Sequence, residues 1–398
     1  MISVEEAKKR VIKNSKTLSK ISISLDNCLN YAVAEDILAP FPLPSFRQSA
    51  MDGYAVNLLE NTNKFLCIGE IAAGSSRTDN LKKGEGVRIF TGAAVPESAN
   101  CVIMQEWITA SESEDHYNCT IDSSKKVLSN HHIRPVGEQL LKGAIVLKKG
   151  TAITPAGIGL LRSFGITKVT AFSRPKVAVI VTGDELMLPN EELKHGQIYE
   201  SNSFGIKHTL EQKGFESPSV YLVKDNYTEL TRTLKNALEN YDLIIATGGI
   251  SVGKYDFVGK ILKEQGVNEI FHKVKQKPGK PLFFGTKDKK IVFGLPGNPA
   301  ASLSCLHEYV LPSIKKISGY TNHGNITLNL PLKNSFKNRG DRNKFLKAII
   351  SDNQVEIVDG QASSMLHSFA LANCLVNIKG VSNQQVIEKG TLVEVHLL

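Results

Sequence analysis

The sequence lacks long apolar runs, paired cysteines and blocks of like charge. No uninterrupted apolar stretch approaches the ~20 residues that span a bilayer. The first residues, MISVEEAKKRVIKN, are polar with helical periodicity, unlike a signal peptide. The six cysteines form no C-x-x-C pair, so neither a zinc site nor a disulfide framework is indicated. We therefore expect a protein of the reducing cytoplasm, with no membrane partner.

The net charge of +9 comes from lysines and arginines that are spread along the whole chain. The sequence contains no dense basic run, RNA-recognition signature or zinc-finger spacing, so we expect no nucleic-acid partner. A basic balance without such a block favours a small anionic ligand, such as a phosphorylated compound.

Length and local sequence patterns predict several domains, because a chain of 398 residues is too long for one ordinary hydrophobic core. Ser3 and Glu6 form a capping box before an apolar helical face, and TPAGIGLLRSFG predicts a second helix. Between them, short β-prone runs alternate with turn residues. We predict a small helical linker domain of residues 1–21 and 148–173, interrupted by an inserted all-β domain of residues 22–147.

The second half of the chain alternates buried-strand and helix patterns, beginning with PKVAVIVTGDEL. This alternation predicts a three-layer, mostly parallel α/β domain over residues 174–322. Residues 323–398 again contain short β-prone runs, which predict a small C-terminal β-barrel. The expected fold class is therefore α/β and multidomain.

Three expected strand ends in the α/β domain carry unusual loops: VTGDEL (181–186), ATGGISVGKYD (246–256) and GLPGNPAAS (294–302). Ligands of open parallel sheets bind at the carboxyl ends of the strands. Glycines allow backbone N–H groups to converge on an anion, and a following helix N-terminus adds positive potential. The three loops together predict an anion-binding site.

The segment GISVG fits the G-x-S-x-G pattern of a serine nucleophile. However, the strand ends near Ala246, so Ser251 would lie several residues beyond the sheet edge. No downstream histidine has a supporting motif. We favour a phosphate-binding hydroxyl for Ser251, with a simple turn residue and a hydrolase nucleophile as the alternatives.

In this order, GDEL, TGGISVGKYD, KPGKP and LPGNPAAS resemble the molybdopterin molybdenumtransferase family, which includes MoeA and the C-terminal domain of gephyrin. SAMDGYAV, VRIFTGAAVP, SANCVIMQE and IRPVGEQLLKG extend the resemblance over nearly the whole chain. It implies a transferase of molybdenum cofactor biosynthesis that inserts molybdate into adenylylated molybdopterin and releases AMP. It also implies Mg²⁺, a homodimer and a candidate partner, the molybdopterin adenylyltransferase.

Site residues are carried over from the resemblance by position. The catalytic set is Asp52, Thr91, Glu185, Asp256, Lys273 and Lys277. The substrate-binding set is Gly248, Gly249, Ser251, Gly253, Lys280, Pro296, Gly297, Asn298, Ser302, Arg134, Arg342 and Ser363. The Mg²⁺ set is Asp184, Glu185, Asp242 and Asp256.

Four of these residues carry a further expectation. Asp242 precedes its strand, so its spacing alone would place it at the wrong end of the sheet, and only the resemblance supports its role. Arg134 and Arg342 are candidates for molybdate, because a guanidinium fork suits an oxyanion. The resemblance implies that Arg342 and Ser363 complete the site from a second subunit.

One position departs from the family pattern. Gln139 stands where the family has an aspartate after G-E, and we assign it no role. A neutral amide there keeps open an alternative function, a scaffold protein of the same fold with weakened catalysis.

Overall fold

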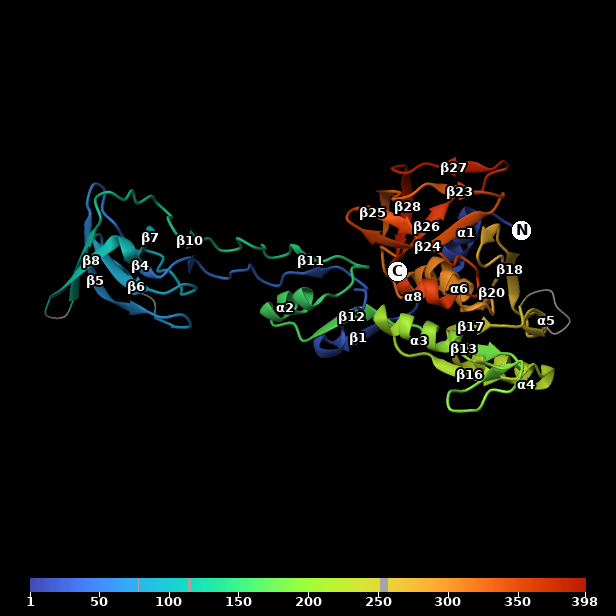
Figure 1. Cartoon of the computed structure of the whole chain (residues 1–398). Helices are drawn as coiled ribbons and strands as arrows, with labels where there is room; N and C mark the ends of the chain where they lie inside the picture. Colours follow the sequence, from blue (N-terminus) through green and yellow to red (C-terminus); the bar gives the residue numbers. More distant parts are fainter. Residues whose placement is uncertain (78, 114–115, 251–256) are drawn as a thin grey trace. The chain divides into compact units, whose positions relative to one another are not determined.

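The computed structural model describes residues 1–77, 79–113, 116–250 and 257–398 (Figure 1). The chain divides into two compact units. The first comprises residues 1–35, 149–155 and 168–398, and the second comprises residues 36–148 and 156–167. No helix among the described residues is long and apolar enough to cross a membrane.

The first unit is built around a six-stranded sheet in the order β16-β13-β17-β21-β20-β18. Its strands are β16 (Ser219–Val223), β13 (Val177–Thr182), β17 (Leu243–Thr247), β21 (Lys290–Leu295), β20 (Pro281–Lys287) and β18 (Asn268–Lys273). The first four are mutually parallel, and β20 and β18 are antiparallel to their neighbours. The prediction of a mostly parallel sheet is confirmed.

Both faces of this sheet are buried, as the continuous apolar run of β13 predicts. Val177, Val179 and Val181 enter the core on one face, and Ala178 and Ile180 enter the core on the other. The first face carries α1 (Val4–Asn14), α3 (Asn202–Gln212), α6 (Pro299–Cys305), the π-helical turn η3 (Leu306–Val310) and α7 (Leu311–Ile317). The second face carries α4 (Tyr227–Asn240) and α5 (Phe257–Glu264). The predicted three-layer architecture is present.

The first helix begins where its sequence predicts. The Ser3 hydroxyl accepts a hydrogen bond from the backbone N–H of Glu6, 3.1 Å away. Its apolar face packs in the core of the α/β domain through Val4, Ala7 and Val11. In the linker, β1 (Lys20–Ser24) pairs antiparallel with β12 (Lys168–Phe172), and η1 (Leu25–Asn27) follows β1.

The C-terminal part is a second six-stranded β structure, in the order β19-β24-β26-β28-β22, with β25 on β24. Its strands are β19 (Gln276–Lys277), β24 (Asn343–Ser351), β26 (Cys374–Ile378), β28 (Leu392–Leu397), β22 (Thr327–Pro331) and β25 (Gln354–Ile357). A bridge from Leu332 to Val355 brings β25 back to the end of β22, so the sheet curls on itself. β23 (Phe336–Asn338) pairs with β27 (Gln385–Ile387), and α8 is Leu366–Leu371.

The second unit is mostly β structure. Its main sheet has the order β7-β4-β6-β5-β9-β8. These strands are β7 (Cys101–Met104), β4 (Gly53–Val56), β6 (Glu85–Ile89), β5 (Lys64–Ile71), β9 (His116–Ile121) and β8 (Ile108–Ser113). The remaining elements are β2 (Ile37–Leu38), β3 (Gln48–Ser49), η2 (Gln105–Trp107), β10 (Ile133–Arg134), β11 (Ile145–Leu147) and α2 (Pro155–Ser163).

Candidate functional site

A pocket of about 610 Å³ lies at the carboxyl ends of the parallel strands in the first unit. Four strand ends contribute to its lining. These residues are Thr182, Gly183 and Glu185 after β13, Asp225 after β16, Thr247, Gly248 and Gly249 after β17, and Pro296, Gly297 and Asn298 after β21. The rule for open parallel sheets, applied to the sequence, therefore locates the pocket correctly.

The loop after β17 depends on glycine. Gly248 and Gly249 both have left-handed backbone conformations, with φ of +88° and +58°. A Cβ on Gly248 would lie 2.3 Å from the carbonyl oxygen of Thr182. The ends of β13 and β17 can therefore approach closely only because this position has no side chain.

Asp225 connects two of the loops that line the pocket. Its carboxylate accepts a hydrogen bond of 2.5 Å from the hydroxyl of Thr182. Its backbone N–H donates to the Asp184 carboxylate at 3.1 Å. Glu185 also lines the pocket, so acidic oxygens from both loops face the same space.

Asn202, at the start of α3, connects the other two loops. Its Nδ2 donates to the Thr247 hydroxyl at 2.9 Å and to the Gly297 carbonyl at 2.7 Å. Its Oδ1 is buried and has no hydrogen-bond partner among the described residues. Asn202 therefore connects the loop after β17 to the loop after β21.

The C-terminal β structure reaches this pocket within the same chain. Asn298 Nδ2 donates to the Ser363 hydroxyl at 2.8 Å, and the backbone N–H of Ala301 donates to the Ser363 carbonyl at 3.2 Å. Ser364 lines the pocket. The expectation that Ser363 arrives from a second subunit is therefore corrected, because its own chain brings it to the PGNP loop.

Basic residues gather in the turn between β19 and β20. Lys277 and Lys280 are exposed on either side of the buried Pro278 and Gly279, and Pro281 lines the pocket. In the parallel pairing of β19 with β24, Lys277 stands opposite Lys344.

Arg342 belongs to the same basic group. Burial lowers the pKa of Lys344, and the nearby charges of Lys277 and Arg342 lower it further. Arg342 stands two residues before Lys344, which pairs with Lys277. Like charges this close favour a bound anion.

The carboxylates of Glu185 and Asp225 suit a Mg²⁺ ion that is held jointly by the protein and by substrate phosphates. The described residues contain no group of three or more His, Cys, Asp or Glu side chains placed to hold a metal. Mg²⁺ is commonly bound by one or two carboxylates together with substrate phosphates. Glu185 and Asp225, on adjacent loops of one pocket, provide that donor set.

Comparison with known proteins gives matches over nearly the whole chain. Residues 2–165 match the MoeA N-terminal region (domains I and II), residues 178–316 a probable molybdopterin-binding domain, and residues 329–398 the MoeA C-terminal region (domain IV). A molybdopterin molybdenumtransferase of Haemophilus influenzae is 35% identical over 387 residues, covering 94% of each chain. One from Staphylococcus aureus is 32% identical over 392 residues, covering 96% of this chain and 92% of that protein.

The chain belongs to the MoeA family of molybdopterin molybdenumtransferases. It is a transferase of molybdenum cofactor biosynthesis, as the sequence resemblance implies. The fold agrees, since the crystal structure of a molybdopterin biosynthesis MoeA protein from Pyrococcus horikoshii superposes with a TM-score of 0.85. That protein is 27% identical, and the match covers all of both chains.

The structure of this MoeA-family enzyme brings together many of the predicted site residues. Those that line the pocket are Glu185, Gly248, Gly249, Pro296, Gly297 and Asn298. Ser302, in α6, is 1% exposed, and its hydroxyl has no hydrogen-bond partner among the described residues. Lys273 is exposed at the end of β18, where the basic segment begins. Ser251, Gly253 and Asp256 lie outside the described residues.

Asp242 lies at the opposite end of β17 from the pocket. It directly precedes Leu243, whereas the pocket begins at Thr247. Its carboxylate accepts a hydrogen bond of 2.8 Å from the backbone N–H of Lys176. The strand spacing gave the correct position, and we withdraw the Mg²⁺ role that the resemblance suggested for Asp242.

Three predicted residues belong to the second unit. Asp52 accepts hydrogen bonds from the Thr91 backbone N–H at 2.8 Å and from the Thr91 hydroxyl at 2.7 Å. These bonds lower the pKa of Asp52, which keeps the carboxylate ionised. Arg134 is exposed in β10, where it pairs with Gln48 of β3.

Asp225 and Asn202 are among the pocket residues that were not predicted from the sequence. Asp225 lies two residues after the strand SVYLV, and Asn202 is the first residue of the helix that follows Tyr199, Glu200 and Ser201. The signal for Asp225 was present, because it stands at the carboxyl end of a parallel strand like the three loops. Asn202 gave no such signal, since its contacts lie 45 and 95 residues away.

Proposed function

We propose that this pocket binds adenylylated molybdopterin and that the enzyme inserts molybdate there with release of AMP. The observation that carries the proposal is the meeting of three loops, Asp225 and Ser364 around one space of about 610 Å³. That volume suits a small molecule with two phosphates.

The glycine loops suit the phosphates of this substrate. Backbone at Gly248, Gly249 and Gly297 can approach a phosphate oxygen without a side chain in the way. These contacts would hold the linkage between AMP and the pterin phosphate, which is the bond that breaks.

Glu185 and Asp225 would hold Mg²⁺ beside the phosphates, with Asp184 next to them. A bound divalent ion offsets the negative charge that develops on departing AMP. Thr182 orients the Asp225 carboxylate through its hydroxyl. We extend the Mg²⁺ role to Asp256 on the family resemblance alone.

The basic group suits molybdate and the phosphates. Lys277, Arg342 and Lys344 are neighbouring cations, and a dianion would relieve their mutual repulsion. We assign Lys273 and Lys280 supporting roles in the same electrostatic field. Asp52, fixed by Thr91, keeps a proposed catalytic role on the resemblance.

The partners and location of the enzyme are proposed from the family resemblance. A homodimer and delivery of the substrate by the molybdopterin adenylyltransferase rest on the family resemblance, as does a cytoplasmic location. Sedimentation of the purified protein tests the first, and co-purification with the adenylyltransferase tests the second. Ser363 meets Asn298 within one chain, and we keep for Arg342 the second-subunit role that the resemblance implies.

Release of AMP from adenylylated molybdopterin, with and without molybdate, tests the proposed function. We expect release to depend on molybdate and to fall roughly 10- to 100-fold in Asp225→Asn, because both its charge and its support from Thr182 are used. Asp242→Asn is the matched control at the far end of the sheet and should keep activity within about twofold. A scaffold protein would release no AMP under any of these conditions.

A further inference from the structure

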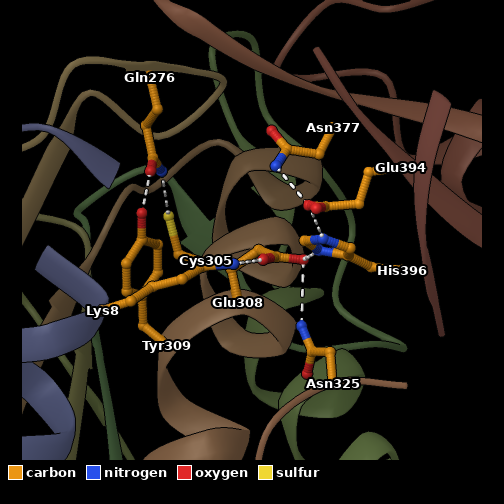
Figure 2. A network of polar contacts seen from close by, with 9 residues as sticks. All are labelled: Lys8, Gln276, Cys305, Glu308, Tyr309, Asn325, Asn377, Glu394 and His396. Atoms are coloured by element: carbon orange, nitrogen blue, oxygen red, sulfur yellow. Dashed lines mark hydrogen bonds and ion pairs between the residues drawn. The ribbon is translucent and has the colours of Figure 1, made fainter. Parts of the chain in front are cut away.

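The π-helical turn η3 directs two side chains into separate groups of polar contacts (Figure 2). Glu308 meets Lys8 and His396, while Tyr309 meets Gln276. π-Turns inside α-helices occur frequently at functional sites. The Tyr309 side is the one connected to the basic turn of the pocket.

Gln276 holds that turn from its buried side. It is completely buried, and its Nε2 donates to the Gly279 carbonyl at 3.1 Å. The same nitrogen lies 3.5 Å from Cys305 Sγ. The hydroxyl of Tyr309, also completely buried, donates to Gln276 Oε1. One amide therefore connects helix and turn.

The turn itself has little freedom. Gly279 has a left-handed conformation with φ of +80°, and a Cβ there would lie 2.4 Å from Cys305 Sγ. Pro278 and Gly279 are buried, whereas Lys277 and Lys280 on either side are exposed. The position of the two ammonium groups thus depends on how the buried part of the turn is held.

Packing alone does not require polar atoms at these two positions. Tyr309 belongs to the apolar core that includes Phe284 and Leu306, and an unpaired amide or hydroxyl there is costly. A leucine and a phenylalanine could fill similar space without that risk. The hydrogen bond from Tyr309 orients the amide of Gln276, and that amide in turn orients the Gly279 carbonyl.

We propose that Tyr309 and Gln276 are positioning residues, which hold the turn so that Lys277 and Lys280 face the anionic substrate. This inference rests on the proposed function of the two lysines. Neither Tyr309 nor Gln276 lines the pocket, so neither is proposed as a catalytic residue.

The test compares Tyr309→Phe, Gln276→Leu and the double variant with the wild-type enzyme. KM for adenylylated molybdopterin, kcat and the Kd for AMP are measured for each. We expect each single variant to raise KM and Kd about tenfold while kcat stays within about twofold, because the proposed function gives Lys277 and Lys280 a role in anion binding. The double variant should also raise KM and Kd about tenfold, because the same Tyr309–Gln276–Gly279 connection is broken in all three variants.

Two controls separate this inference from general destabilisation and from the proposed function. Tyr320→Phe removes another tyrosine hydroxyl, one that donates to the Asn30 carbonyl, and should lower Tm without changing KM. Lys277→Ala should weaken AMP binding by itself. If it does not, the proposed function of the turn is wrong, whatever Tyr309→Phe does.

The positioning role is overturned if Lys277→Ala weakens binding while Tyr309→Phe and Gln276→Leu keep the wild-type KM. It is also overturned if the effects of the two single variants multiply in the double variant. Should Tyr309→Phe not fold, Gln276→Leu with its own KM and kcat decides the matter.

Discussion

Replacing Glu308 by glutamine should loosen the attachment of the C-terminal β structure to the helices. The Glu308 side chain is completely buried and has three partners from three parts of the chain. Lys8 Nζ lies 2.5 Å away, His396 Nδ1 2.7 Å and Asn325 Nδ2 3.2 Å (Figure 2). His396 also contacts Glu394 at 2.8 Å through its other ring nitrogen.

The magnitude follows from this burial. Removing one partner of a buried ion pair costs about 3–5 kcal/mol, because the remaining charge is left without compensation. Glutamine keeps the shape of Glu308 and one oxygen acceptor, and the Lys8 side chain is 32% exposed and can turn to solvent. We therefore expect the lower end, about 3 kcal/mol, which corresponds to roughly a 150-fold change in an equilibrium constant.

Hydrogen exchange of the β28 backbone amides measures this effect locally, which matters because a multidomain chain need not unfold in one step. Exchange of β28 should accelerate by about two orders of magnitude in Glu308→Gln. The matched control is Glu356→Gln, which breaks an exposed 2.6 Å pair with Lys333 and should cost at most about 1 kcal/mol. Equal exchange rates in the two variants would show that the buried Glu308 pair does not hold β28 in place.

Three further outcomes are expected. Burial alone lowers the pKa of His396, but the hydrogen bond and charge of Glu308 outweigh it and raise that pKa. The His396–Glu308 pair therefore stabilises the fold fully below the ordinary histidine pKa of about 6.5, and this stability is lost as pH rises through the raised pKa of His396. Protection of the β28 amides from exchange should fall over that pH range. Protection that does not change with pH would contradict this expectation. Gly248→Ala, which places a Cβ 2.3 Å from the Thr182 carbonyl, should lose about 1–3 kcal/mol in urea unfolding and most AMP release, whereas wild-type values would show that the loops can separate. All six cysteines are buried, and burial raises the pKa of Cys119 to about 11, so Ellman's reagent should label the native enzyme slowly and six thiols after denaturation, while fast labelling would indicate an open core.

The sequence predicts the parts of this structure that depend on local patterns. The run VAVIVT forms a strand buried on both faces, and Ser3 caps the first helix. The three loops meet because carboxyl ends of parallel strands share one edge. The same rule placed Asp242 correctly at the far end, although the family resemblance suggested otherwise.

Contacts between distant segments could not be predicted in this way. Ser363 approaches Asn298 across 65 residues, and Glu308 meets His396 across 88. The docking of the C-terminal strands on the helices decides both contacts, and no periodicity in the sequence encodes it. The pairing of Gln276 with Tyr309 depends in addition on a π-turn, which lacks a sequence signal.

The central claim is that the carboxyl edge of the sheet binds the adenylylated substrate. A crystal structure of the enzyme with AMP tests it most directly. We expect the phosphate within hydrogen-bond distance of backbone N–H groups at Gly248, Gly249 or Gly297, with Asp225 and Glu185 nearby. AMP bound at the Asp242 end of the sheet, or in the second unit alone, would contradict it.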